Sequence, residues 1–108
     1  MDKGKLKEHY DYLNSMYNRF IDIKFDLSSK SNKKDKLFYQ RKLDSIIHTV
    51  SRYIKSDFEL YHFIASNRLD TKINAPADSF FYDEFFRETY FANSLKDRLD
   101  NMKELIQK

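Results

Sequence analysis

Residues 6–27 read LKEHYDYLNSMYNRFIDIKFDL, and they decide the fold class because their apolar side chains recur at helical spacing. Steps of three, four or seven residues return to the same face of a helix with 3.6 residues per turn. The positions are Leu6, Tyr10, Leu13, Tyr17, Phe20 and Leu27, with Met16, Ile21 and Ile23 widening the stripe. We therefore predict an amphipathic helix over about 3–27, which needs partner helices to cover its apolar face.

A second amphipathic segment follows a polar connection. Residues 28–36 (SSKSNKKDK) contain no apolar side chain and are rich in Ser and Lys, which is typical of a solvated segment. We place the loop at 28–32 and begin the next helix at about 33, because Asn32 suits the N-cap position. Helical spacing then continues to about 54, through Leu37, Leu43, Ile46, Ile47, Val50, Tyr53 and Ile54.

A short third helix is predicted over about 57–66. Ser56 and Glu59 match the capping box S-x-x-E, in which the Ser oxygen accepts a backbone N–H at the start of a helix. Ser56 is therefore the expected cap. The apolar residues of this helix are Phe58, Tyr61, Phe63 and Ile64.

A last helix is predicted over about 79–107, after a loop at 67–78 that contains the single Pro of the chain. Its expected core residues are Phe81, Phe85, Ala92, Leu95, Leu99, Met102 and Ile106. We favour one continuous helix, although Asn93 and Ser94 could mark a kink. With no strand-like alternation and no internal repeat, the expected fold is all-α: a small antiparallel bundle of three to four helices in a single domain, residues 1–108.

Composition excludes several chemistries. The chain has no Cys, so disulfides, thiolate metal sites and Cys nucleophiles are absent, and its one Gly cannot build a glycine-rich phosphate loop. Charges fill the N-terminal segment where a signal peptide needs an apolar run, so we expect a cytoplasmic protein. Phe, Tyr, Met, Ile, Asn and Lys make up 50 of the 108 residues, a bias typical of low-GC genomes such as those of many bacteria, phages or plasmids.

Two residues have the spacing of a carboxylate and histidine metal motif. Glu59 and His62 form E-x-x-H, which places both side chains on one helix face. Helical di-metal sites need two such motifs and further inward Glu residues, and the chain has one motif. We therefore expect no metal and no other cofactor.

The pair Arg41 and His48, with six residues between them, resembles the R-x4-6-H signature of the HEPN helical ribonucleases. That family is also a small helical bundle, but the polar residue that usually follows its Arg is replaced here by Lys42. The resemblance implies a ribonuclease as one alternative. Asp44, four residues before His48, would orient the imidazole in a concave site that includes Arg41.

The segment 30–42 is basic and contains two aromatic residues, Phe38 and Tyr39. Lys and Arg neutralise phosphates and aromatic rings stack on bases, so a nucleic-acid-binding protein is a second alternative. The residues that would carry it are Lys30, Lys33, Lys34, Lys36, Arg41 and Lys42.

The stretch 79–91 (SFFYDEFFRETYF) motivates the leading hypothesis. On a helical wheel, Phe86 and Tyr90 lie on one flank of the core-facing stripe, and Phe80 and Phe91 lie on the other. A helix that is apolar nearly all round is central in its fold or exposes apolar surface. We therefore expect a non-enzymatic interaction module that binds a protein partner or itself through these four residues. A regulator or inhibitor, encoded by a phage or mobile element, has this character.

Overall fold

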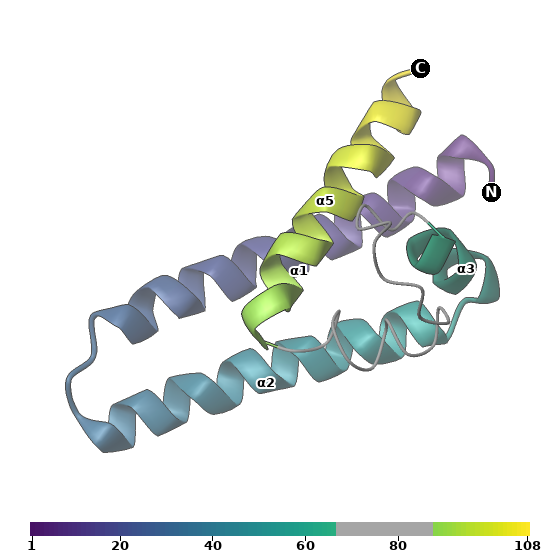
Figure 1. Cartoon of the computed structure of the whole chain (residues 1–108). Coiled ribbons are helices and arrows are strands. Elements are labelled where there is room, and N and C mark those ends of the chain that lie inside the picture. The colour runs from purple at the N-terminus through teal and green to yellow at the C-terminus, as the bar shows by residue number, and fades with distance from the viewer. Residues whose placement is uncertain (67–87) are drawn as a thin grey trace.

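A computed structural model of the chain describes residues 1–66 and 88–108, and within these ranges it is all-α (Figure 1). The predicted loop 67–78 and the first residues of the predicted last helix lie outside the described residues. The helices in the described ranges are α1 (Lys3–Ser28), α2 (Lys33–Lys55), α3 (Phe58–Ser66) and α5 (Glu88–Gln107). The predicted class, a small helical bundle, is confirmed.

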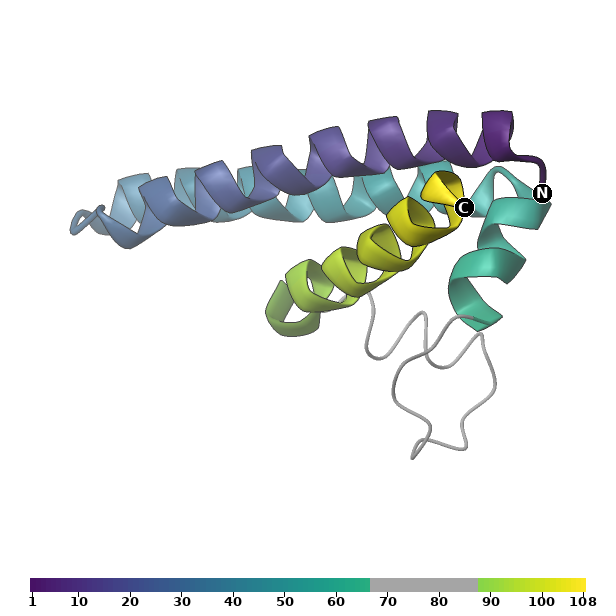
Figure 2. The same ribbon diagram turned by 90° about the horizontal axis from the view of Figure 1, so that it is seen from above.

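The first two helices form an antiparallel hairpin whose ends are set by local capping. The Asp2 carboxylate accepts a hydrogen bond from the Lys5 backbone N–H at 2.8 Å and begins α1. The predicted cap at Asn32 is confirmed, because its side-chain oxygen accepts from the Lys34 N–H at 2.8 Å. With 26 residues, α1 is about 39 Å long. The two helices, α1 and α2, run beside each other over most of the length of the molecule (Figures 1 and 2).

The start of α3 differs from the prediction by one residue. Ser56 still belongs to the end of α2, since its N–H donates to the Arg52 carbonyl at 3.0 Å and its hydroxyl donates to the Tyr53 carbonyl at 2.7 Å. The cap is Asp57, whose carboxylate accepts from the Leu60 N–H at 3.0 Å. The predicted capping box is wrong because a carboxylate one residue later takes the role that the motif gives to Ser.

All four helices contribute to one hydrophobic core, with α1 packed on both α2 and α5. In Figure 2, α5 crosses the α1–α2 hairpin obliquely and α3 closes one end. The buried apolar residues are Leu6, Leu13, Met16, Phe20, Leu43, Ile46, Ile47, Val50, Ile54, Leu60, Ile64, Ala65, Phe91, Ala92, Leu95, Leu99 and Met102. Most of the predicted stripe positions on α1, α2 and α5 are among them.

Phe91 is a correction to the predicted flanks of the last helix. It is fully buried, and its ring centroid lies 4.9 Å from that of Phe20 on α1. The buried face of α5 is centred near Leu95, and Phe91 lies about 40° from Leu95 on the helical wheel. The prediction placed Leu95 at one edge of the core-facing stripe, and Phe91 therefore fell on the flank beyond it. The helix is continuous through Asn93 and Ser94.

A buried charged residue links α5 to α3. Arg98 is almost fully buried among the core helices, and its guanidinium donates to the Ile64 carbonyl at 3.4 Å and the Ser94 carbonyl at 3.3 Å. The first contact reaches the last turn of α3, where backbone carbonyls have no partner within the helix. Arg98 therefore supplies one donor, its Nε–H, to the C-terminal end of α3.

The far end of the hairpin carries no buried residue. Fully buried side chains end at Phe20 on α1 and begin again at Leu43 on α2, so residues 21–42, here called the hairpin tip, contribute to the core only through the partly buried Ile23 and Leu27. In Figure 1 the tip extends away from α3, α5 and both chain termini. Leu37, predicted to lie in the apolar stripe of α2, is 52% exposed because the described helices do not cover this part of the hairpin.

Candidate functional site

Positive charge is concentrated at the hairpin tip. Its 22 residues include seven Lys or Arg and three Asp, a formal charge of +4, whereas the whole chain carries +3. The rest of the chain is therefore close to neutral, at −1. Charge of one sign at a projecting end attracts and orients a partner of the opposite sign.

A hollow of about 530 Å³ opens at the tip between the end of α1 and the start of α2. Lys36 precedes Leu43 by seven residues, so it occupies the inward face of α2 that is apolar further along the helix. A long charged side chain at that position leaves space where the hairpin would otherwise be packed. The lining residues are Leu27, Ser28, Lys30, Lys33, Lys36, Leu37 and Gln40.

Another part of the tip combines cations with aromatic rings. Phe38 is 56% exposed, and the Lys42 ammonium lies 4.6 Å from its ring centroid and 5.3 Å from that of Tyr39. Lys30 lies 5.2 Å from the Tyr39 ring. Cation–π contacts at exposed sites contribute about 0.5–1 kcal/mol, so they restrain the lysines without neutralising them.

The six basic residues predicted for nucleic-acid binding all lie at the tip, but they divide between its surfaces. Lys30, Lys33 and Lys36 line the hollow, and Lys42 packs on the aromatic rings. Lys34 and Arg41 are exposed. The structure therefore brings together three of the six around one feature.

The residues of the ribonuclease resemblance lie on the exposed side of α2. Arg41, Asp44 and His48 are all exposed, and the Asp44 carboxylate accepts a hydrogen bond from the Gln40 amide at 3.4 Å. The hollow at the tip includes Gln40 in its lining but neither Asp44 nor His48. These three side chains share a helix face without being enclosed.

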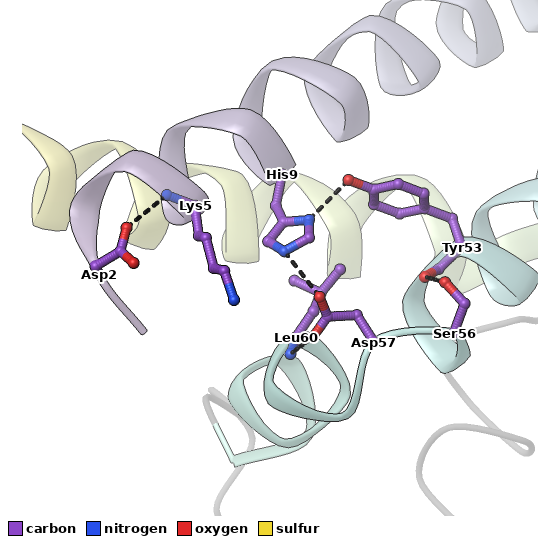
Figure 3. Close-up of polar contacts among 7 residues, drawn as sticks. All are labelled: Asp2, Lys5, His9, Tyr53, Ser56, Asp57 and Leu60. Atoms are coloured by element: carbon purple, nitrogen blue, oxygen red, sulfur yellow. Dashed lines mark hydrogen bonds and ion pairs between the residues drawn. The ribbon is translucent and has the colours of Figure 1, made fainter.

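The sequence analysis missed a cluster around His9, which Figure 3 shows. The His9 side chain is 12% exposed; its Nδ1 lies 2.7 Å from the Tyr53 hydroxyl and its Nε2 lies 3.4 Å from an Asp57 carboxylate oxygen. Tyr12 stacks on Tyr53 at a centroid distance of 3.9 Å. His9 thus joins α1 to α2 and to the N-cap of α3. Its position three residues after Leu6 is the signal that could have indicated a buried His.

The electrostatics of this cluster favour a structural role. Burial raises the pKa of the Tyr53 hydroxyl, with further contributions led by Tyr12 and then Asp57. The Tyr53 hydroxyl and His9 Nδ1 share a hydrogen bond whose direction depends on the tautomer of the ring, and Nε2 faces Asp57. The pKa of the Asp57 carboxyl is lowered, and the largest cause is the hydrogen bond that it accepts from the Leu60 N–H. Partial burial acts in the opposite direction, and the charge of His9 lowers the pKa further. A Tyr that stays protonated is a poor nucleophile. The contacts of His9 with Tyr53 and Asp57, by contrast, connect α1 to α2 and to the start of α3.

The E-x-x-H pair does not form an enclosed site. Glu59 and His62 are both exposed, and His62 packs edge-on against Phe58 at a centroid distance of 4.3 Å. The described residues contain no cluster of three or more His, Cys, Asp or Glu placed to hold a metal ion.

The four residues of the leading hypothesis have different surroundings. Tyr90 is 49% exposed and Phe91 is fully buried, while Phe80 and Phe86 lie outside the described residues. Within the described ranges, no helix combines the length and apolar character of a membrane span.

Comparisons with models of protein families, with curated proteins and with solved structures found no match to this chain. The functional assignment therefore depends on the surfaces and contacts described above.

Proposed function

We propose that this protein is a non-enzymatic binding module that contacts a protein partner through the hairpin tip. The observation that carries the proposal is the concentration of exposed apolar side chains there. Among the described residues, four large hydrophobic side chains of the tip are exposed, namely Ile21, Phe25, Leu37 and Phe38. Phe25, at 75%, is nearly as exposed as an unfolded chain would leave it. Clustered exposed apolar surface is typical of protein interfaces.

The arrangement of these residues supports one continuous surface on α1. Ile21 and Phe25 are four residues apart, and Ser28 follows Phe25 by three, so the three side chains lie along one helix face. Ser28 and Leu37 both line the hollow. An apolar strip therefore leads into the hollow, and a partner that covers both would bury hydrophobic area while its acidic groups meet the lysines.

Affinity capture from a lysate of the host cell, with and without nuclease, tests this proposal. We expect the wild-type protein to retain a specific protein partner after nuclease treatment. The double variant Phe25→Ser with Leu37→Ser should bind that partner at least tenfold more weakly, because the binding energy of an interface is concentrated in a few buried apolar side chains.

The matched control is Phe58→Ser, which removes another exposed Phe, 77% exposed, located on α3 rather than on the tip. It should bind as the wild type does. If the tip variant retains its partner, or if the control loses it equally, the hairpin tip is not the binding surface.

Self-association is one form of this proposal and is simple to measure. If a second copy is the partner, solution mass shows a dimer that dissociates in the Phe25→Ser, Leu37→Ser variant. A monomeric wild type would exclude a second copy as the partner and leave a different protein.

Nucleic-acid binding is a second candidate, favoured by the exposed Phe38 ring with the Lys42 ammonium beside it. Aromatic stacking and phosphate neutralisation act together in proteins that bind single strands. Fluorescence anisotropy with a single-stranded oligonucleotide should then show affinity that falls steeply with salt and is reduced by Lys33→Glu with Lys34→Glu. Affinity that stays constant from low to high salt would contradict it.

A further inference from the structure

We infer that the hollow at the hairpin tip recognises an acidic segment of the partner protein, in which carboxylates stand next to apolar side chains. The inference rests on the proposed function and deepens it by naming the chemistry of the partner. It is carried by the lining of the hollow, its volume and its place beside the exposed apolar strip.

The first step is charge complementarity. Lys30, Lys33 and Lys36 all line the same hollow, and none of the described residues that line it is acidic. Three positive residues on one hollow, with no negative residue to balance them, attract an anion that enters it. Lysine ammonium groups on flexible stems also adjust easily to carboxylates at slightly different depths.

The second step is the apolar part of the lining. Leu27 and Leu37 belong to the same hollow as the lysines, and Leu37 is half exposed. Burying an aliphatic side chain of this size contributes more to affinity than a single ion pair at the surface, which is screened by water and salt. The apolar contacts therefore supply most of the affinity, and the lysines select for acidic neighbours.

The third step distinguishes a peptide from a nucleic acid. Base stacking requires aromatic rings, and the rings of the tip, Phe38 and Tyr39, do not line the hollow. A sugar–phosphate backbone has no hydrocarbon side chain to place against Leu27 or Leu37. The volume of about 530 Å³ lies within the range of about 300–1,000 Å³ usual for ligand sites, and it suits a few side chains of a peptide.

The test uses the full chain and three fluorescent probes: a short peptide of alternating Leu and Glu, the same peptide with Gln for Glu, and a single-stranded oligonucleotide. We expect the Glu peptide to bind at least tenfold more tightly than the Gln peptide. Backbone amide shifts should locate it at Lys33, Lys36 and Leu37. Equal binding of the two peptides would overturn the inference, and so would an oligonucleotide that binds at the hollow in preference to the Glu peptide.

Charge reversal gives a second, independent readout. Lys33→Glu with Lys36→Glu should weaken the Glu peptide at least tenfold and strengthen a peptide of alternating Leu and Lys, a gain that loss of folding cannot produce. Lys33→Gln with Lys36→Gln should have an intermediate effect. The control Lys42→Glu changes a lysine that packs on the aromatic rings, and it should leave binding of the Glu peptide within about twofold.

The two proposals fail in different ways. Suppose that Phe25→Ser with Leu37→Ser abolishes capture of the natural partner, while Lys33→Glu with Lys36→Glu leaves it unchanged. That result contradicts the acidic segment and leaves the protein-binding function in place. Capture that neither variant changes contradicts both.

Discussion

At the scale of single residues, His9 connects three helices of the fold through polar contacts. Its two ring nitrogens face Tyr53 on α2 and Asp57 at the cap of α3, so one side chain fixes the positions of both elements relative to α1. His9 is far in the chain from Tyr53 and Asp57, and periodicity predicts helices without predicting which polar groups meet between them. This cluster could therefore not be derived from the sequence, although the place of His9 in an apolar stripe was visible.

Tyr53→Phe tests the contribution of the His9 hydrogen bond. The substitution keeps the ring that stacks on Tyr12 and removes the hydroxyl, so the free energy of unfolding should fall by about 1 kcal/mol. Urea denaturation followed by circular dichroism measures the change. The control is Tyr90→Phe on the exposed side of α5, which should change stability by less than about 0.5 kcal/mol. Equal effects would show that the contact with His9 has no energetic role.

The lowered pKa of Asp57 predicts a dependence of stability on pH. Its carboxylate is favoured in the folded state by the Leu60 N–H and by the charges of His9 and Lys5, against partial burial. A group whose folded pKa is lowered stabilises the protein above its unfolded pKa and loses that contribution as pH falls through the folded value. Stability from Asp57 should thus be complete near neutral pH and decline below about pH 4.

Asp57→Asn isolates this effect, because Asn is as good an N-cap as Asp and removes only the charge. The melting temperature of the variant should lie below that of the wild type at neutral pH, and the two curves should converge as the pH is lowered into the acid range. A difference that stays constant down to acid pH would mean that the Asp57 charge is not the cause.

At the scale of helices, the sequence predicted where each helix begins and ends better than it predicted which side of the helix is buried. The ends of α1 and α2 follow from the apolar stripes and the Asn32 cap, and the structure places them within one residue of the prediction. The buried side of α3 was less evident, since Leu60 is buried while Phe58 is 77% exposed. On a nine-residue helix with apolar residues on several sides, tertiary packing decides which side faces the core.

A pair of substitutions on α5 tests the face that the structure assigns. Phe91→Ala removes a fully buried ring packed on Phe20 and should cost about 3–5 kcal/mol of the free energy of unfolding. Tyr90→Ala, one residue earlier and half exposed, should cost far less. Chemical denaturation of both variants measures the difference, and a larger loss for Tyr90→Ala would mean that α5 packs through the other flank.

At the scale of the molecule, the core and the proposed binding surface lie toward opposite ends of the same hairpin. The core lies where α3 and α5 cover α1 and α2, near the end where the N- and C-termini meet in both ribbon views. The hairpin tip contains no buried residue and carries a formal charge of +4. Surface residues remote from the core change stability by less than about 0.5 kcal/mol each, so the tip can vary for recognition without loss of the fold.

Native-state hydrogen exchange tests this division directly. Amides near Leu13 on α1 and Val50 on α2 are surrounded by fully buried side chains and should exchange only when the whole protein unfolds. Amides of the same two helices within the hairpin tip should exchange through local opening, which needs less free energy because no fully buried side chain is exposed by it. Added denaturant should accelerate exchange strongly at Leu13 and Val50 and weakly at the tip. Equal protection along both helices would mean that the hairpin opens as one unit, and the tip would then have no stability independent of the core.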